Sequence, residues 1–460
     1  MQRVRNMRVG AMLGMLALVL AACGATATQK PAASGTPAGP AATGTAAPQA
    51  TGTPVAGACQ TDTTKTAIEV DSWWTTGGEA NGFNKLLDTF NAANPSLCAY
   101  NAAIAGGAGT VAQGRIKAAV LAGLPPDSFQ VHMGHELLDT YVNLDGGSLM
   151  SPLDDIVDAS KFPAGVIQIV SGTDGHIYTV PLNIHRANEL WYNKSVFEAN
   201  GITAPTTWDE FKTAADKLKA ANITPIAVGD TGIWASGMIF ETVLIGELGP
   251  DGFNALWTDA AAWSDAKVLA AFDTYKMVLG YQNADHSSLS WDQANQLVID
   301  GKAGMTIMGD WANGDYVAKN FTGYGWAPAP GNTNVYQALA DSFPLPVKAT
   351  HPEETKKLLT FMASAEGQDI FNPYKGSIPA RIDSGKAPAG GLDYNEYQKS
   401  AMKEWVASTT KVVPSMEHGA AANPAFASAI NDALTAFVAD GNSQAAQAAI
   451  AAAAAQYVTK

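Results

Sequence analysis

The chain has 460 residues, 47% of them hydrophobic, and its 28 basic and 42 acidic residues give a net charge of −14. This length is too great for a single hydrophobic core, so we expect two domains or two lobes. The acidic balance argues against nucleic acid and anionic lipid as partners, while a small neutral or polar ligand stays open.

The N-terminus has the features of an export signal. Three arginines precede an apolar stretch from Val9 to Leu20, which is shorter than the roughly 18 apolar residues that a membrane span needs. The stretch ends in Leu-Ala-Ala-Cys at Cys23 and resembles the lipobox of bacterial lipoproteins, although an ordinary signal peptide can also contain a chance cysteine. The resemblance implies removal of residues 1–22, which would change the net charge to −17, and acylation of Cys23.

Residues 23–58 are rich in Ala, Thr, Pro and Gly, and Lys30 is the only charged residue among them. Such a composition cannot bury enough apolar surface to fold, so a disordered tether is expected. Cys59 and Cys98 remain, in an oxidising compartment. Cys59 precedes the first expected strand and Cys98 begins the next one, and parallel neighbours in a sheet could bring the two within disulfide distance, with two free buried thiols as the alternative.

Strands and helices alternate after the tether. The expected order is strand Ala67–Asp71, helix Gly82–Asn94, strand Ala99–Ile104, helix Val111–Ala122 and strand Asp127–His132. This alternation predicts parallel βαβ units whose functional loops lie at the carboxyl ends of the strands.

A second unit follows residues 178–183. Thr207 to Glu210 is typical of a capping box that opens a helix. Further on we expect a helix over Trp291–Ile299, a strand over Gly304–Met308 that ends in a loop at Trp311, and a helix from Ser443.

Two enzyme-like patterns are incomplete. Residues 107–112 fit G-x-G-x-x-A but follow the second strand, without the acidic residue of a dinucleotide site, so a tight turn explains the glycines. The sequence His-Glu-Leu-Leu-Asp at 135–139 has Asp139 where a zinc-protease helix needs its second histidine. No metal site is expected.

Aromatic residues stand beside polar ones at several expected loops: Trp73 and Trp74 with Glu79, His185 and Arg186 near Trp191, Asp310 with Trp311, and Asp341 after an extended run. An indole can cover the C–H face of a pyranose, while carboxylates, lysine, histidine and amides pair with its hydroxyls. This composition favours a sugar cleft.

Most tryptophans have a structural interpretation instead. We expect core positions for Trp191, Trp208, Trp257 and Trp263, and ligand contact for Trp73, Trp74 and Trp311, which lie at strand ends. His185 and Arg186 could equally line a hinge or touch a ligand.

Several motifs together resemble, in order along the chain, those of the extracellular solute-binding proteins that serve ABC sugar importers: SWWTTGGE, VHMGHEL, VPLNIHRANELWYNK, TTWDEF, MTIMGDWANGD, DSFPLP, KGSIPAR and VVPSMEHG. SWWTTGGE and KGSIPAR are similar to the glucose- and mannose-type monosaccharide binders. The resemblance covers residues 66 to about 440.

The resemblance implies an α/β fold of the type II periplasmic-binding-protein kind, with two lobes built from mostly parallel sheets flanked by helices. Lobe 1 would comprise residues 59–184 and 340–375, and lobe 2 residues 185–339 and 376–460. The chain would cross between lobes near Asn183–His185, Tyr336–Asp341 and Lys375–Ser377.

The resemblance also implies sugar contacts from Trp73, Trp74, Glu79, His132, Trp311, Asp341, Lys375 and His418. His185, Arg186 and Asp310 are possible further contacts. Lys375 and His418 rest on the resemblance alone, and either His132 or His135 could be the contact.

We therefore expect a monomeric lipoprotein on the outer side of the cell membrane, not an enzyme and without a cofactor. It would capture a glucose- or mannose-like monosaccharide and deliver it to the permease subunits of an ABC importer. The alternatives are a binder of another carbohydrate or polyol, such as an oligosaccharide, a sensor lobe, and a carbohydrate-active enzyme.

Overall fold

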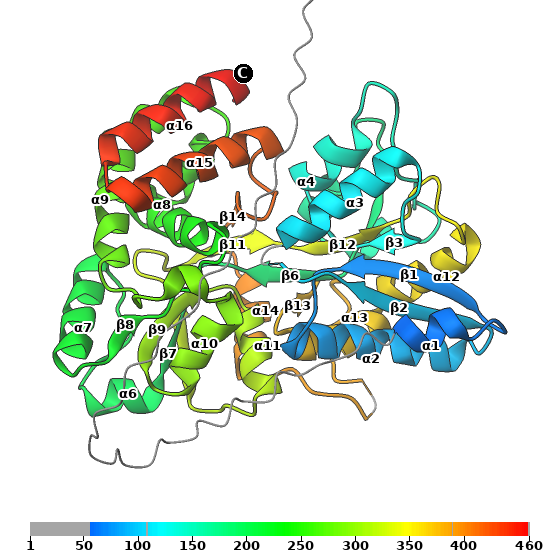
Figure 1. Cartoon of the computed structure of the whole chain (residues 1–460), viewed down its shortest axis with the longest axis horizontal. Helices are drawn as coiled ribbons and strands as arrows, with labels where there is room; N and C mark the ends of the chain where they lie inside the picture. The colour runs from blue at the N-terminus through cyan, green and yellow to red at the C-terminus, as the bar shows by residue number, and fades with distance from the viewer. Residues whose placement is uncertain (1–55, 107–108, 389, 459–460) are drawn as a thin grey trace, which may run out of the picture. The chain divides into compact units, whose positions relative to one another are not determined.

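The computed structural model describes residues 56–106, 109–388 and 390–458 (Figure 1). All of them lie in one compact unit, Gly52–Lys460. The expected signal 1–22, the acylation site Cys23 and most of the tether 23–58 lie outside the described residues. The last tether residues begin helix α1 (Ala56–Thr61), so the tether ends earlier than expected. No helix in the described ranges is both long and apolar enough to span a bilayer.

The first sheet is parallel and has the strand order β2-β1-β3. Its strands are β1 (Thr66–Ser72), β2 (Leu97–Ala103) and β3 (Ser128–Phe129), and its connecting helices are α2 (Gly77–Ala93) and α3 (Thr110–Ala122). The apolar stripe of α2, with Phe83, Leu86, Leu87 and Phe90, is buried. The alternation of strands and helices predicted this arrangement.

Helix α2 begins five residues before the expected start at Gly82. Gly77 has a φ of 64°, and Glu79 lies in the first turn of the helix rather than in a loop. A Cβ on Gly78 would lie 2.2 Å from the carbonyl oxygen of Tyr374 and 2.6 Å from that of Gly314. Gly78 therefore allows two other backbone segments to approach the helix closely.

The expected strand Asp127–His132 is divided between two sheets. Its second half, β4 (Val131–His132), belongs to an antiparallel sheet of order β4-β12-β5, with β12 (Asp341–Pro344) and β5 (Thr179–Pro181). Helices α12 (Pro352–Ala363) and α13 (Ala365–Lys375) follow, and α13 packs along α2. Shorter segments between β4 and β5 are α4 (His135–Leu137), η2 (Leu138–Val142), η3 (Ala159–Lys161) and α5 (Ala164–Gln168).

A third sheet has the order β10-β7-β9-β8. It consists of β7 (Glu189–Asn193), β8 (Thr224–Ile226), β9 (Ala303–Met308) and β10 (Tyr324–Pro328). Its flanking helices and turns are α6 (Lys194–Ala199), α7 (Trp208–Ala220), α8 (Trp234–Ala255), η4 (Ala260–Ser264), α9 (Ala266–Leu279), η5 (His286–Ser288), α10 (Trp291–Ile299) and α11 (Trp311–Ala318).

Two of the three expected crossings, Asn183–His185 and Tyr336–Asp341, overlap neighbouring strands of a fourth sheet, of order β13-β6-β11-β14, and the third, Lys375–Ser377, directly precedes β13. Its strands are β6 (Asn183–Arg186), β11 (Val335–Leu339), β13 (Ile378–Pro379) and β14 (Lys411–Pro414). His185 pairs with Leu339, and Ile184 pairs with Ile378. In Figure 1 these strands lie between β1 and β2 on the right and β7 and β9 on the left.

Three helices complete the chain: α14 (Glu396–Trp405), α15 (Pro424–Asp440) and α16 (Ser443–Tyr457). The alanine-rich tail is helical, as its composition predicted, and packs on α15 and η4. Trp191, Trp208, Trp257 and Trp263 all belong to hydrophobic clusters or pack against them, in agreement with their expected structural role.

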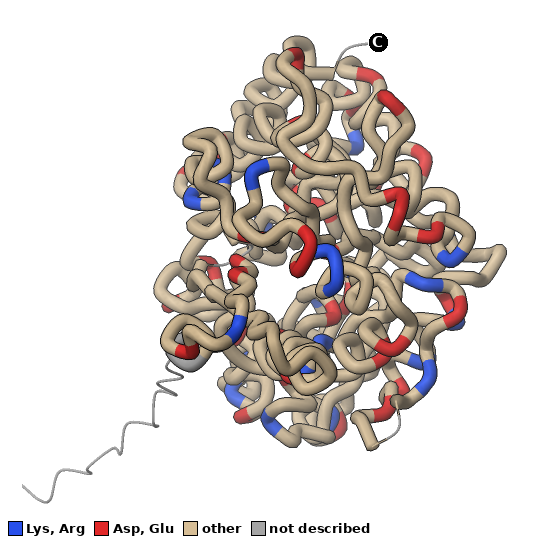
Figure 2. The backbone as a smooth tube through the Cα atoms, turned by 90° about the vertical axis from the view of Figure 1, so that its right-hand side faces the viewer, with Lys and Arg blue, Asp and Glu red and all other residues tan. Residues whose placement is uncertain are grey.

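Cys59 and Cys98 are joined by a disulfide, with their Cα atoms 5.3 Å apart. Cys98 pairs with Ala67 in the register of β2 and β1, so the bridge ties α1 to the amino end of the first sheet. Basic and acidic residues are interspersed along the tube in Figure 2, which shows no broad face of basic residues in that view.

Candidate functional site

A small polar pocket lies where the fourth sheet meets the ends of several helices. Its lining residues are Glu79, His132, His185, Trp234, Trp291, Trp311, Leu339, Asp341, Lys375 and His418. The cavity measures about 30 Å³, which is room for about two water molecules. In this conformation the side chains therefore fill most of the space between them.

Six of the eight expected sugar contacts line this pocket, although they come from distant parts of the chain. Glu79 lies in the first turn of α2, His132 ends β4 and Trp311 begins α11. The other three are Asp341 at the start of β12, Lys375 at the end of α13 and His418 in the loop after β14.

The two tryptophans of SWWTTGGE do not line the pocket. Trp74 is fully buried in an aromatic cluster, with ring centroids 5.2 Å from Phe83 and 5.0 Å from Phe371. The expectation that its indole stacks on a ligand does not fit this position. Trp73 lies beside His132, with ring centroids 5.0 Å apart. Trp73 therefore contacts a residue of the pocket wall without lining the pocket itself.

Arg186 and Asp310, the possible further contacts, also lie outside the wall. The Arg186 guanidinium pairs with Glu189 at 2.8 Å and with Glu404, and it lies over the Tyr336 ring. Asp310 is fully buried and pairs with Nδ1 of His185. His185, the third of these candidates, is part of the wall.

Asp341 is held from several sides. Its Oδ2 accepts from Nδ2 of Asn183 at 2.9 Å and lies 3.1 Å from Nε2 of His185, and its Oδ1 accepts from Nε2 of Gln130 at 2.8 Å. Burial raises the pKa of Asp341, but the His185 hydrogen bond and the charge of Lys375 outweigh burial and hold it well below its usual range. Asp341 is therefore a fixed carboxylate.

His185 lies between two aspartates, and both of its ring nitrogens have a carboxylate partner. Burial lowers the pKa of His185, but the attraction of Asp310 and the hydrogen bonds to Asp310 and Asp341 raise it overall. A histidine that is paired on both sides is favoured as the cation. His185 therefore orients Asp341 and balances its charge.

Lys375 forms an ion pair with Glu79. Its ammonium also lies 5.3 Å from the centroid of Trp74 and 5.7 Å from that of Trp311, within cation–π distance of both indoles. Burial raises the pKa of Glu79, and the charge of Lys375 only partly offsets this. The pair lies at the junction of α2 and α13, in direct contact with the pocket.

His132 and His135 lie in different surroundings, and only His132 lines the pocket. His132 is 3% exposed in the pocket wall, and its Nδ1 lies 2.7 Å from Oε2 of Glu136. Burial lowers the pKa of His132, but Glu136 raises it overall. The side chain of His135 is 46% exposed and pairs with Asp139 instead.

Sequence reasoning missed two tryptophans of the wall, Trp234 and Trp291. Both stand in the first turn of a helix, α8 and α10, as Trp311 does in α11. Their signal in the sequence was this shared helix-start position, whereas only strand ends were considered. Gln130 was also missed; its side chain links the backbone N–H of Trp73 to Asp341.

The enzyme-like patterns gain no support from the fold. The histidine and aspartate of residues 135–139 hydrogen-bond to each other at 2.8 Å. The described ranges contain no group of three or more potential ligands that could hold a metal ion. Two residues of the G-x-G-x-x-A pattern, at 107 and 108, lie outside the described chain.

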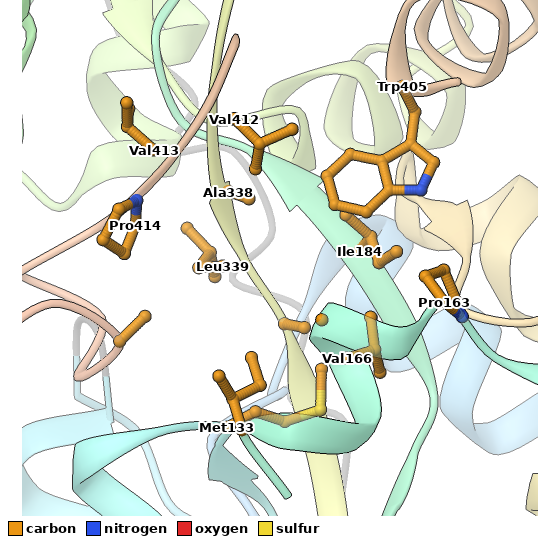
Figure 3. Close-up of a pocket in the computed structure, with 14 residues that line it drawn as sticks. Met133, Pro163, Val166, Ile184, Ala338, Leu339, Trp405, Val412, Val413 and Pro414 are labelled. Carbon is orange, nitrogen blue, oxygen red and sulfur yellow. The ribbon is translucent and has the colours of Figure 1, made fainter. Parts of the chain in front are cut away.

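A larger cavity of about 360 Å³ lies on the fourth sheet and shares only Leu339 with the polar pocket. Its wall is almost entirely carbon, with Ile184, Val412 and Trp405 among the labelled side chains in Figure 3. A polyhydroxylated ligand would lose hydrogen bonds to water there without replacing them. The polar pocket is therefore the better candidate.

Residues 76–369 match the family of bacterial extracellular solute-binding proteins, and the chain belongs to that family. An uncharacterised ABC transporter extracellular-binding protein from Pyrococcus horikoshii is 38% identical over 82% of this chain and 87% of its own. A probable sugar-binding periplasmic protein from Rhizobium meliloti is 32% identical over 80% and 88%. The chain is thus an extracytoplasmic solute-binding protein of the ABC transporter class and not an enzyme.

The solved structure of the bacterial solute receptor AcbH superimposes with a TM-score of 0.72 at 22% identity, covering 85% of this chain and 98% of AcbH. At this level of identity the similarity concerns the fold. It agrees with the two-lobed α/β architecture of the type II periplasmic binding proteins that the sequence motifs implied.

Proposed function

We propose that this protein captures a monosaccharide, a glucose- or mannose-like hexose, in the polar pocket and delivers it to the permease subunits of an ABC importer. The observation that carries this proposal is the combination of an indole wall with charges that are already paired. Glu79 pairs with Lys375, and Asp341 pairs with His185. A site whose charges balance internally suits an uncharged ligand with many hydroxyls.

The ligand would exchange hydrogen bonds with these pairs. Hydroxyls can donate to the carboxylates of Glu79 and Asp341 and accept from Lys375, while Trp311 covers an apolar sugar face. A micromolar affinity corresponds to about −8 kcal/mol. Spread over the roughly 12 heavy atoms of a hexose, this is about −0.7 kcal/mol per atom, below the ceiling of about −1.5. A single hexose therefore supplies enough contacts.

Binding requires a change of conformation, because a hexose does not fit into about 30 Å³. The wall includes Glu79 and His132 from the proposed lobe 1 and Trp234, Trp291 and Trp311 from the proposed lobe 2. Separation of the two lobes about the crossing strands would open the pocket, and a ligand that bridges both would favour the closed form. The boundaries proposed for the lobes remain residues 59–184 with 340–375, and 185–339 with 376–460.

The relatives agree with a sugar ligand. The Rhizobium meliloti relative is named a probable sugar-binding periplasmic protein. The structural report on AcbH describes an exclusive substrate preference for β-D-galactopyranose. These properties belong to those proteins, and their transfer to this chain is part of the proposal.

We also propose that the mature chain is a monomer tethered to the membrane by acylated Cys23. The membrane anchor is inferred from the lipobox-like sequence that ends at Cys23. Growth with radiolabelled palmitate should label the chain and should not label the Cys23→Ala variant. Release of unlabelled wild-type protein into the medium would contradict the anchor.

A second candidate ligand is an oligosaccharide, and one cavity favours it. A hollow of about 410 Å³ adjoins the polar pocket and shares Trp234 with it, and its wall includes Gln113, Glu136, Asn431 and Asp432. Further sugar rings bound in the pocket could extend into this space.

A thermal-shift screen tests the proposal and separates these two candidates. The mature chain is mixed with D-glucose, D-mannose, D-galactose, D-xylose, maltose and a polyol. A clear rise in melting temperature with a hexose, and a weaker one with maltose, is expected because bound ligand stabilises the folded state. A strong response to maltose with none to hexoses would favour the oligosaccharide, and no response to any carbohydrate would overturn the proposal.

A further inference from the structure

His418 is connected to a buried glutamate through one serine hydroxyl. Nδ1 of His418 lies 3.0 Å from Oγ of Ser415, which in turn donates to Oε2 of Glu241 at 3.0 Å. Ser415 and Glu241 are fully buried, and His418 is 3% exposed at the pocket. Glu241 comes from the middle of α8, far from the other two in sequence.

Glu241 is held in place as an acceptor. Besides the serine hydroxyl, its carboxylate accepts from the backbone N–H of Met416 and, at 3.4 Å, from that of Glu417. Burial raises the pKa of Glu241 to about 7, and above that pH its ionised carboxylate only accepts hydrogen bonds. These contacts fix both the loop that carries His418 and the direction of the carboxylate.

The direction of the hydrogen bonds then follows from the number of protons. A serine hydroxyl has one proton, and that proton goes to Glu241. Ser415 must therefore accept from His418, which places a proton on Nδ1. Burial and the nearby His132 and His185 lower the pKa of His418 well below its usual value, so its ring is neutral and carries no second proton.

We propose that Glu241, acting through Ser415, holds His418 in the Nδ1–H tautomer, so that Nε2 faces the pocket as a hydrogen-bond acceptor for a ligand hydroxyl. This inference rests on the proposed sugar-binding function. Glu241 and Ser415 are positioning residues, since neither lines the pocket. The neutral His418 ring thus adds a hydrogen-bond acceptor to the pocket without adding a charge, in a site that already contains several carboxylates.

The packing around the ring supports this assignment. His418 lies between His132 and Trp311, each with a ring centroid 5.3 Å away, and close to Trp234. These neighbours limit rotation of the imidazole, so the two nitrogens cannot readily exchange places. The nitrogen that faces the ligand is therefore set by the Ser415 contact.

The tautomer can be read directly by NMR on protein labelled with ¹⁵N-histidine, without any sugar. Burial raises the pKa of Glu241 to about 7, so the spectra are recorded at about pH 8.5, where the carboxylate is ionised. The His418 signals are assigned by their loss in His418→Gln. We expect the wild-type ring to carry its proton on Nδ1.

Ser415→Ala should move that proton to Nε2, because Nδ1–H would otherwise be buried against a methyl group without an acceptor. Glu241→Gln gives a second variant: its amide donates toward Ser415, the serine then donates to Nδ1, and the proton again moves to Nε2. Ser128→Ala is the matched control. Ser128 is fully buried and donates to the carbonyl of Pro344 at 2.7 Å, away from the pocket, so its loss should leave the tautomer unchanged.

A proton on Nε2 in the wild type, or an unchanged proton position in Ser415→Ala and Glu241→Gln, would overturn the inference. With D-glucose as the probe, Ser415→Ala should also weaken binding by about tenfold, whereas Ser128→Ala should not. The tautomer could behave as expected while the wild type binds neither glucose nor any other sugar. In that case the hydrogen-bond chain from Glu241 through Ser415 to His418 would be confirmed, and the proposed sugar-binding function would be wrong.

Discussion

The ammonium group of Lys375 and the carboxylate of Glu79 form an ion pair although 296 residues separate them in the sequence. Glu79 stands in the first turn of α2 and Lys375 in the last turn of α13, and these helices pack along each other. Both groups line the polar pocket. In this conformation the charged groups of the pocket therefore pair with one another. A ligand must compete with those internal pairs.

The positions of Trp74 and Trp311 predict opposite effects for the same substitution. Trp74→Leu removes part of a fully buried aromatic cluster, so the free energy of unfolding should fall by about 2 to 4 kcal/mol, while the Kd for glucose should stay within about threefold. Trp311→Leu removes an indole of the wall and should raise that Kd by about tenfold or more. Urea unfolding and calorimetric titration measure the two quantities. A large loss of affinity in Trp74→Leu would show that its indole does touch the sugar.

His132 and His135 form a second matched pair. His132→Ala removes a side chain from the wall and takes the imidazole partner of Glu136 away, so glucose binding should weaken by about tenfold. His135 is exposed outside the pocket, so His135→Ala should bind like the wild type. Equal affinity of the two variants, measured by fluorescence titration, would remove His132 from the site.

Substitution of Gly314 tests whether the close backbone contact between α11 and α13 is needed for glucose binding. A Cβ there would lie 2.4 Å from the carbonyl oxygen of Lys375 and 2.6 Å from that of Tyr374. Gly314→Ala should therefore force α11 away from α13 and weaken glucose binding. The radius of gyration measured by small-angle X-ray scattering should rise.

Gly114 in α3 serves as the control, because a Cβ there meets nothing within 4 Å. Gly114→Ala should leave binding unchanged and stabilise the helix by up to about 1 kcal/mol. Normal glucose affinity in Gly314→Ala would mean that this contact is not needed for binding.

The protonation of Glu241 predicts how stability depends on pH. Burial raises its pKa to about 7, and the hydrogen bonds from Met416 and Ser415 only partly offset this. Between about pH 4.5 and pH 7 the folded state then holds a proton that the unfolded state has released. The free energy of unfolding therefore falls as pH rises through this window, by up to about 3 kcal/mol in total for this group.

Glu417 contributes with the same sign, since burial and the charge of Glu241 raise its pKa well above the usual value. Glu241→Gln lacks the first titration. Urea unfolding at several pH values should show the wild type losing stability relative to this variant from about pH 4.5 to pH 7. A difference that stays constant, or that grows in favour of the wild type, would contradict a raised pKa of Glu241.

Much of the fold followed from local patterns. Alternating strands and helices predicted the parallel first sheet and the helix that connects its first two strands. The start of α2 was missed because Gly77 and Gly78 carry no helix-forming signal. Gly78 instead allows close contact with Tyr374 and Gly314, which lie far away in the sequence.

The site was predictable only in part for the same reason. Both Trp73 and Trp74 were expected to contact a ligand, but Trp74 is fully buried and Trp73 lies beside His132. The choice of Trp74 for the interior depends on Phe343 and Phe371, which reach it only in the folded chain. Lys375 and His418 lie in segments with no local sign of function, and only the family resemblance indicated them.

Isothermal titration of the mature chain with D-glucose, in the wild type and in Lys375→Met, tests the central claim most directly. One binding site with a micromolar or lower Kd is predicted for the wild type. The variant, which loses a charge-assisted donor at the pocket, should bind about ten to a hundred times more weakly. Absence of binding by any monosaccharide, or the same Kd for both proteins, would contradict the account.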